Sequence, residues 1–354
     1  MPVEASTATD ARRLVTVERI AHIEPIADAD AIEAAHVRGW TVVVKKGQFI
    51  VGDPVVYIEV DAALPIADHR FAFLAARGTK IVDGQPVHVL KTARLRGVYS
   101  QGIVFPLAGF PEFVDTDEGT SLDAIIGVAR WEPPAPPGLA ALGPFPSFLH
   151  KTDAERVQTL DDDTWAHIQS DRASWRPTEK VDGTSLTAWR TSDGVLHVAS
   201  RNWELDPATA NVYWEIAEVS GISDQLEIGQ WVQGEVVGPA VQGNPLRLDK
   251  LQLVTFGFGT YDPATPSIVT TMRAPMGDWP DWVEQQSAPV YDLALPATIA
   301  EAVAQVETVK SLLAPSRDAE GVVWTHAMGA SVAGLEDRAV WKSISARYLT
   351  KNGG

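Results

Sequence analysis

A proline-rich segment near the middle of the chain limits the folds that are available to it. Residues 131–138 read Trp-Glu-Pro-Pro-Ala-Pro-Pro-Gly, and two further prolines lie in residues 143–146. Proline lacks a backbone N–H and fixes φ, so this segment should form no regular structure and act as a semi-rigid spacer. A chain of 354 residues is long enough for two cores. We therefore expect domains at residues 12–128 and 148–350, joined by a linker over residues 129–147.

The first expected domain is rich in short strand patterns. Residues 40–45 and 54–60 are runs of β-branched and aromatic residues bounded by Gly and Asp, and residues 87–92 and 101–107 are two more. Residues 28–33 are expected to form a short turn or helix between strands. Short strands separated by turn residues favour a small barrel, and an OB-like barrel fits best.

The second expected domain mixes helices with strands, which gives the whole chain an α+β class. Residues 153–168 have apolar side chains at helical spacing, with Thr152 or Asp153 as the N-cap. Residues 296–313 carry a second apolar stripe from Ile299 to Leu312. Strands and loops alternate between these two expected helices.

Composition excludes several functions. The chain has no cysteine, which removes disulfides, thiolate catalysis and zinc–thiolate sites and fits a cytoplasmic location. No apolar run is long enough to span a membrane. The net charge of −17 argues against a generally basic nucleic-acid binder, but it leaves room for a local basic groove. Cationic side chains gather in the first third: Lys45, Lys46, Lys80, Lys91, Arg94 and Arg96.

The most informative chemistry lies in Thr-Glu-Lys-Val-Asp-Gly-Thr-Ser, residues 178–185. A lysine amine is nucleophilic only when neutral, and its ordinary pKa is about 10.4. Burial or a nearby cation would have to lower that pKa before Lys180 could attack phosphorus. Asp182 could orient the amine or a metal-bound water, and Gly183 would allow a sharp turn. The same residues also fit a surface hairpin, because Asp-Gly is a common turn signal.

Five later segments carry side chains suited to a nucleotide pocket. Arg201 follows a strand and could hold a phosphate, and Glu235 interrupts an apolar strand, so it needs a partner, a metal or solvent. Phe256 or Phe258, among glycines, could stack on a base. Glu320 precedes a glycine and a strand, and Lys342 lies within a strand. Taken alone, Glu235 fits an ordinary solvent-facing strand position equally well, and Arg201, the phenylalanines and Lys342 each fit an ordinary surface or core position better.

Taken in order, these segments resemble the covalent nucleotidyltransferase superfamily of ATP-dependent polynucleotide ligases and mRNA capping enzymes. Glu179 directly before the lysine, and residues 238–244 after Glu235, resemble RNA ligases in particular. The N-terminal barrel resembles the fifth RNA ligase family, in which residues 151–156 would belong to the helix that enters the ligase domain. One position departs from the broader RNA ligase pattern, because Ile344 stands where a second lysine is frequent.

The resemblance implies a fold and a site. The second domain would be an ATP-grasp-like nucleotidyltransferase of antiparallel sheets with helices. Lys180 would take the nucleotide, and Asp182, Glu235 and Glu320 would hold Mg²⁺ or Mn²⁺, directly or through its waters. These three acids, with Lys180 and Lys342, form the implied catalytic set. The implied ATP-binding residues are Glu179, Lys180, Gly183, Arg201, Glu235, Phe256, Lys342 and Arg156.

The implied activity is that of an ATP-dependent RNA ligase. It would seal 3′-hydroxyl and 5′-phosphate ends of RNA, as expected for nicks in duplexes, through lysyl-AMP and RNA-adenylate intermediates. Three alternatives stay open: a DNA ligase, a GTP-using capping enzyme and a non-catalytic nucleic-acid-binding protein. Capping enzymes carry their OB domain after the nucleotide domain, whereas here the barrel comes first.

Overall fold

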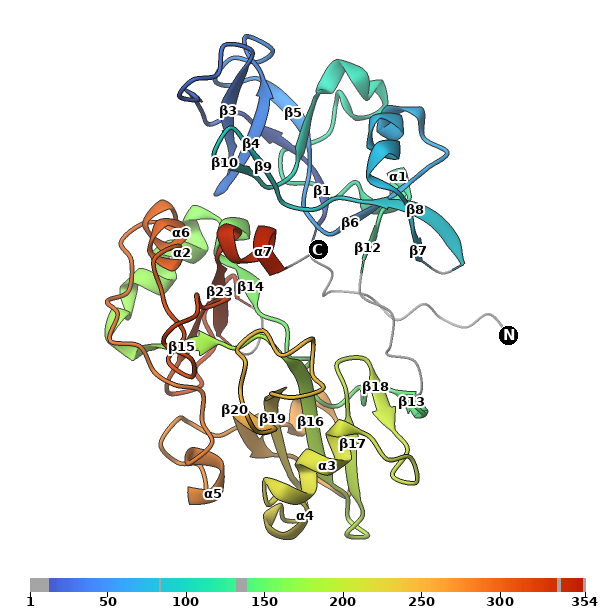
Figure 1. Cartoon of the computed structure of the whole chain (residues 1–354), viewed down its shortest axis with the longest axis vertical. Coiled ribbons are helices and arrows are strands. Elements are labelled where there is room, and N and C mark those ends of the chain that lie inside the picture. Colours follow the sequence, from blue (N-terminus) through green and yellow to red (C-terminus); the bar gives the residue numbers. More distant parts are fainter. Residues whose placement is uncertain (1–12, 83, 132–138, 336–338, 353–354) are drawn as a thin grey trace. The chain divides into compact units, whose positions relative to one another are not determined.

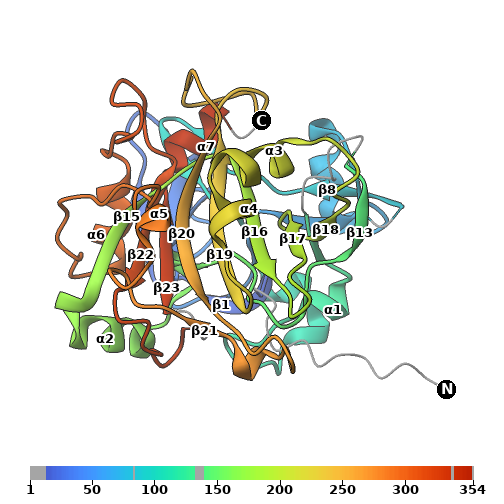
Figure 2. The same ribbon diagram turned by 90° about the horizontal axis from the view of Figure 1, so that it is seen from below.

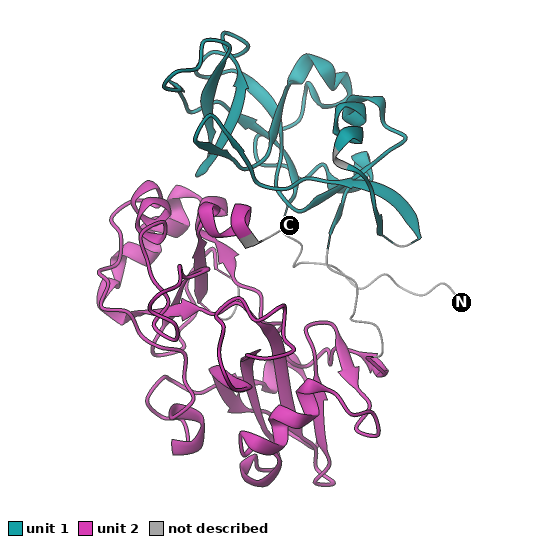
Figure 3. Cartoon of the chain, in the orientation of Figure 1, with its two compact units in different colours: residues 1–134 teal, residues 135–354 magenta. Residues whose placement is uncertain are grey.

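The computed structural model describes residues 13–82, 84–131, 139–335 and 339–352. The chain divides into two compact units, Met1–Pro134 and Ala135–Gly354 (Figure 3). Most of the proline-rich run, residues 132–138, lies outside the described residues. None of the helices that the structure describes is both long and apolar enough to cross a lipid bilayer.

The first unit is built mainly from short antiparallel strands (Figure 1). Buried Val15, Val56 and Ile58 pack with Phe71 and Phe110 inside it. The strands form sheets in the orders β1-β5-β11, β2-β3-β4, β12-β6-β8-β7 and β10-β9. Their bounds are β1 Val15–Arg19, β2 His22–Pro25, β3 Ile32–Val37, β4 Trp40–Lys45, β5 Pro54–Ile58, β6 Ala62–Pro65, β7 Lys80–Val82, β8 Gln85–Val89, β9 Ala93–Leu95, β10 Val98–Ser100, β11 Ile103–Pro106 and β12 Ala129–Arg130. The described residues of this unit also form a short α-helix, α1 Asp123–Ile126, and three 3₁₀ helices, His69–Arg77, Leu107–Gly109 and Pro111–Phe113.

Three of the four expected strands of this unit are shorter than the sequence indicates, and the fourth, β4, has the expected bounds. The expectation for residues 28–33 is wrong at its end, because Ile32 and Glu33 begin β3. They do so because β3 pairs with β4, with Ile32 opposite Lys45. The pairing partner therefore overrides a local sequence that by itself favours a turn.

The second unit contains two sheets. One is seven-stranded in the order β13-β18-β17-β16-β19-β20-β21, and the other is four-stranded in the order β14-β23-β22-β15. Figures 1 and 2 show α3 and α4 against the larger sheet. The bounds are β13 Ala141–Pro144, β14 Glu155–Arg156, α2 Asp162–Ser170, β15 Trp175–Lys180, β16 Thr184–Arg190, β17 Leu196–Ala199, β18 Trp203–Leu205, α3 Val212–Val219, α4 Ile222–Gln225, β19 Gln230–Val237, β20 Gln252–Thr260, β21 Met272–Arg273, α5 Asp281–Glu284, α6 Ile299–Val306, β22 Gly321–His326, β23 Val340–Ile344 and α7 Ala346–Asn352.

Each sheet has its own core. Tyr213 and Ile216 of α3 pack on Leu186 and Val232 of the larger sheet. The smaller sheet is covered by α2 and α6, and tryptophans fill the space, with Trp324 and Trp341 stacked at 5.5 Å between ring centroids. The two sheets have separate cores, and the chain crosses from the smaller sheet to the larger one between β15 and β16.

Three expectations for this unit are corrected. The first helix begins at Asp162 rather than at residue 153, because the side chain of Asp161 caps it by accepting from the Thr164 N–H. Residues 155–156 form strand β14, so the segment expected as the helix that enters this domain is extended. The second helix ends at Val306, and Val309 is buried in the same core from outside the helix.

The linker expectation is also partly wrong. Residues 129–130, placed within the expected linker, form β12, which pairs with β6. Residues 141–144, also within that linker, form β13 at the edge of the larger sheet. Proline is tolerated there because an edge strand leaves one row of N–H groups unpaired.

Candidate functional site

The pairing of β15 with β22 brings Lys180 to Glu320. The two strands are antiparallel, and Lys180 lies opposite Gly321, the residue after Glu320. The Nζ of Lys180 donates to Glu320 Oε1 at 2.6 Å. Their side chains are 25% and 13% exposed, so the ion pair is largely removed from water while a path to the amine remains.

The Val181–Gly183 segment carries the chain from the smaller sheet to the larger one. A Cβ on Gly183 would lie 2.3 Å from the carbonyl oxygen of Val236 and 3.0 Å from Glu235 Cγ, so only glycine fits there. On the larger sheet, Ser185 of β16 pairs with Glu235 of β19. The tight crossing therefore places Lys180, Asp182 and Glu235 around one point.

The charges at this point favour a protonated lysine. Burial alone would lower the pKa of Lys180, but attraction to Glu320 and Glu235, together with the hydrogen bond to Glu320, outweighs burial and raises it. Burial also raises the pKa of Glu320, and it raises that of Glu235 to about 8. The sequence led us to expect a lowered lysine pKa. In the folded protein the pKa of Lys180 is raised instead, because several carboxylates surround its single amine.

A second cluster holds the cationic residues. Arg201 lies in the turn after β17, and its Nη2 donates to both oxygens of Asp153, at 2.8 and 2.6 Å. Lys342 of β23 approaches the same carboxylate at 4.0 Å. Arg156 of β14 lies opposite Lys342 in a parallel pairing and is buried. Asp153 thus holds two of the predicted phosphate-binding cations in place.

The remaining predicted residues are buried or half-buried in the same unit. Phe258 is buried in the core of the larger sheet, whereas Phe256 is only half-buried. Glu179 is buried, and its Oε2 accepts from the backbone N–H groups of Leu312 and Leu313, at 2.7 and 3.3 Å. Burial raises the pKa of Glu179. Glu179 therefore fixes the segment after α6 to the strand that carries Lys180.

Sequence reasoning missed two residues of the site. Asp153 appeared only as a candidate N-cap of an expected helix, and its pairing with Arg201 spans 48 positions. Tyr348 of α7 donates its hydroxyl to Asp182 Oδ2 at 2.7 Å. No local signal marks either residue, because each acts through a partner that is distant in sequence.

The donor set fits a divalent cation. Asp182, Glu235 and Glu320 surround a single amine, and Glu320 Oε2 is buried without a hydrogen-bond partner in the described chain. Hard carboxylate oxygens suit Mg²⁺ or Mn²⁺. Within the described residues no group of three Asp, Glu or His side chains converges closely enough to hold a metal by itself. A cation here would share its ligands with phosphate oxygens or water, as Mg²⁺ commonly does.

A lysine surrounded by carboxylates, beside paired cations and between two mainly antiparallel sheets, defines a nucleotidyltransferase-like ligase domain. Comparison with known proteins agrees. A model of an OB-fold domain matches residues 14–107, and a model of the RNA ligase family matches residues 173–344. None of the curated proteins matches the chain.

Solved structures give the same result over the full length. Naegleria gruberi RNA ligase with PPi has 32% sequence identity and a TM-score of 0.80, covering 97% of this chain and 99% of that one. A lysine-to-alanine variant of that ligase with ATP and Mn matches with the same identity and TM-score, over 96% and 99% of the two chains. A glutamate-to-alanine variant with AMP and Mn also has 32% identity and a TM-score of 0.80, over 97% and 99%. The chain belongs to the RNA ligase family, as an enzyme with an N-terminal OB-fold domain.

Proposed function

We propose that this chain is an ATP-dependent RNA ligase that joins a 3′-hydroxyl to a 5′-phosphate at nicks in RNA duplexes, with Lys180 as the residue that carries AMP. The observation that carries the proposal is the placement of the Lys180 amine, 2.6 Å from Glu320 and flanked by Glu235 and Asp182. Family membership supports the RNA substrate, and the ATP and AMP complexes of the Naegleria gruberi enzyme support the nucleotide.

The first step requires Lys180 to lose a proton. Glu320 Oε1, which already accepts a hydrogen bond from Nζ, is placed to take it. When bound, Mg²⁺ or Mn²⁺ supplies positive charge that offsets the carboxylates and the phosphate oxygens. The Nζ lone pair then forms a bond to the α-phosphorus of ATP, and the bond from that phosphorus to the bridging oxygen breaks, releasing pyrophosphate. The product is lysyl-AMP.

The cationic cluster would serve the phosphates and the base. Arg201 and Lys342, now held by Asp153, would meet the developing charge on phosphate oxygens. Arg156 lies beside Lys342 and would add to the same field. Half-buried Phe256 would stack on adenine, and Phe258 is excluded from that role by its place in the core.

The later steps would use RNA. The 5′-phosphate would take AMP from Lys180 as the N–P bond breaks, and the 3′-hydroxyl would then displace AMP to form the phosphodiester. The OB-fold domain would contact the duplex through its basic side chains, which include Lys91, packed 4.0 Å above the Trp131 ring, and Arg94, 5.3 Å above Tyr99. The cytoplasmic location stays a prediction.

Labelling with ATP tests the first step. The full-length protein is incubated with α-labelled ATP and Mn²⁺, and denaturing gels should show a labelled band that Lys180→Ala abolishes and Lys310→Ala retains. Lys310 is the matched control because it also pairs with a carboxylate, that of Asp318. Mass spectrometry should place AMP on the peptide that contains Lys180. An adduct on another lysine, or undiminished labelling of Lys180→Ala, would overturn the assignment.

Changing the nucleotide and the nucleic acid tests the rest of the proposed function. GTP in place of ATP should label poorly, whereas efficient labelling with GTP would indicate a capping-type enzyme. Sealing of a nicked RNA duplex should exceed sealing of the same nick in DNA, and the reverse would indicate a DNA ligase. A protein that binds RNA without labelling or sealing would be a non-catalytic binder.

A further inference from the structure

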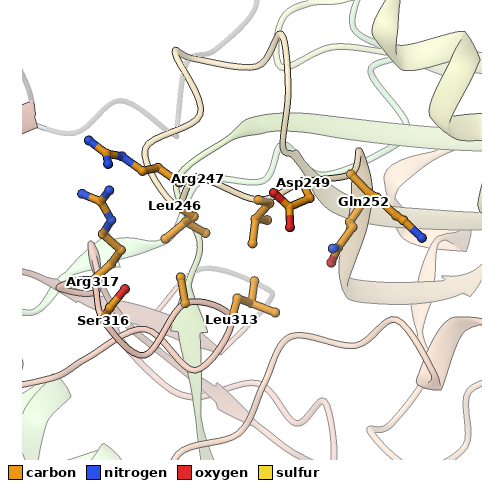
Figure 4. A pocket seen from close by; sticks show the side chains of 10 residues that line it. Leu246, Arg247, Asp249, Gln252, Leu313, Ser316 and Arg317 are labelled. Carbon is orange, nitrogen blue, oxygen red and sulfur yellow. The ribbon is translucent and has the colours of Figure 1, made fainter.

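A cavity of about 610 Å³ opens in the second unit, between the β19–β20 connection and the segment that follows α6 (Figure 4). Leu246 and Leu313 lie in its wall and also pack with Val181, the neighbour of Lys180. In the described chain, none of the residues to which the proposed function gives a role in nucleotide transfer lines this cavity. It is therefore a separate space that shares a wall with the strand end carrying Lys180.

The charge of this cavity is positive in a strongly acidic protein. Arg247, Lys250 and Arg317 line it, against a single carboxylate, that of Asp249. Figure 4 shows the Arg247 and Arg317 side chains on the same side of the cavity. Neither guanidinium forms a salt bridge with any residue that the structure describes, whereas Arg70 and Arg201 are both paired. Two neighbouring cations that form no salt bridge with the described residues attract an anion.

The backbone that presents Arg247 is held in an unusual conformation. Four of the nine described non-glycine residues with positive φ lie in this one connection: Ala240, Gln242, Asn244 and Arg247. Side-chain-bearing residues adopt this region at a cost, and they concentrate at functional sites. The Asn244 side chain fixes the turn, because it donates to the Leu248 carbonyl and accepts from the Leu248 N–H, both at 2.9 Å.

The opposite wall is fixed as firmly. The N–H of Arg317 donates to the Ala314 carbonyl at 2.8 Å, and the Arg317 carbonyl accepts from Ser311 at 3.1 Å. The same segment is tied to Glu179, directly before Lys180, through Leu312 and Leu313. Both arginines therefore stand on turns whose backbones are already ordered, so little ordering would be needed when an anion binds.

We propose that this cavity binds a phosphate of the RNA substrate, with Arg247 and Arg317 as its two ligands. The inference rests on the proposed function and deepens it. Guanidinium groups match phosphate oxygens in geometry and remain charged at any working pH. The apolar wall formed by Leu246 and Leu313 offers a surface for the adjoining ribose or base. The shared wall with Val181 puts this RNA contact beside the residue that transfers AMP.

RNA binding at different salt concentrations tests the site. The probe is a fluorescein-labelled nicked RNA duplex with a 5′-phosphate at the nick, and its Kd is measured for full-length protein across a range of KCl concentrations. Arg247→Ala and Arg317→Ala should each reduce the slope of log Kd against log salt by about 0.7 to 0.9, and the double variant by about twice that. Arg247→Ala keeps a Cβ, so the backbone requirement at positive φ is unchanged.

Arg176→Ala is the matched control, because Arg176 is an exposed arginine of the same unit outside the cavity. It should leave the slope unchanged. Lysyl-AMP formation is measured in parallel and should be equal in the wild type, the cavity variants and the control. An unchanged slope in the double variant would overturn the inference. A raised KM for ATP with unchanged RNA binding would also overturn it and assign the arginines to ATP phosphates.

The parallel assay separates the two proposals. If the wild type forms no lysyl-AMP while the cavity variants still show the reduced salt slope, the proposed activity fails and the RNA contact stands. If labelling is normal and the slope does not change, the activity stands and the RNA contact fails.

Discussion

Replacing Tyr348 by Phe should slow lysyl-AMP formation without unfolding the protein. The Tyr348 hydroxyl donates to Asp182 Oδ2 at 2.7 Å, and the ring is 5% exposed, so Tyr348→Phe removes the hydrogen bond and keeps the packing. A hydrogen bond to a charged group contributes about 1.5 to 3 kcal/mol. If Asp182 must keep this orientation in the transition state, the rate should fall by roughly 10- to 150-fold, since 1.36 kcal/mol corresponds to a factor of ten.

The assay is single-turnover labelling with α-labelled ATP at saturating Mn²⁺, beside circular dichroism to confirm folding. Tyr261→Phe is the matched control: its hydroxyl donates to the Arg190 carbonyl at 2.8 Å, and it is equally buried, at 4% exposure. Tyr261→Phe should label at the wild-type rate. If Tyr348→Phe does so too, Asp182 does not depend on this hydrogen bond, and the reasoning is refuted.

Three further predictions concern the carboxylates and the crossing between the sheets. Gly183→Ala should abolish labelling, because its Cβ would meet the Val236 carbonyl at 2.3 Å, whereas Gly143→Ala, which meets nothing within 4 Å, should not. Glu320→Gln should lower the labelling rate by orders of magnitude, because it removes the negative charge that pairs with Lys180 and that suits a metal ion. Full activity of this variant would show that Glu320 is only structural. The melting temperature of nucleotide-free, metal-free wild type should fall as pH rises toward 8. Burial raises the pKa of Glu235 to about 8, so the folded protein holds a proton that the unfolded chain releases above about 4.5. Glu235→Gln should flatten that dependence, and an equal fall in both proteins would contradict it.

The sequence predicted the local chemistry of the site and much of the strand content. Lys-x-Asp-Gly, an acid within an apolar strand and an acid before Gly321 are patterns over a few residues, and the structure brings Lys180, Glu235 and Glu320 together. Strand β4 was predictable to its ends, because its alternating side chains face a buried and a partly exposed side. Composition and turn spacing also predicted two domains with a barrel first, whereas the ligase character of the second domain came from its resemblance to RNA ligases.

Helix limits were harder to predict from local sequence. Residues 153–168 carry a helical pattern, yet residues 155–156 pair with β23, and the helix begins only after its N-cap, Asp161. Pairing with a strand that lies almost 200 positions later cannot be read from periodicity. The same is true of residues 32–33, which the register with β4 draws into a strand.

By itself, then, the sequence indicated which side chains are candidates for the proposed chemistry: a lysine proposed to take a nucleotide, acids proposed to hold a cation and basic residues proposed to bind phosphates. The tertiary structure alone decided their partners. Lys180 meets Glu320 across 140 positions, Tyr348 meets Asp182 across 166, and Asp153 ties Arg201 to Lys342. It also decided the direction of the pKa shift, because the pKa of Lys180 is raised only where folding gathers three carboxylates around one buried amine. Such contacts depend on strand register and packing between distant segments, and no local pattern encodes them.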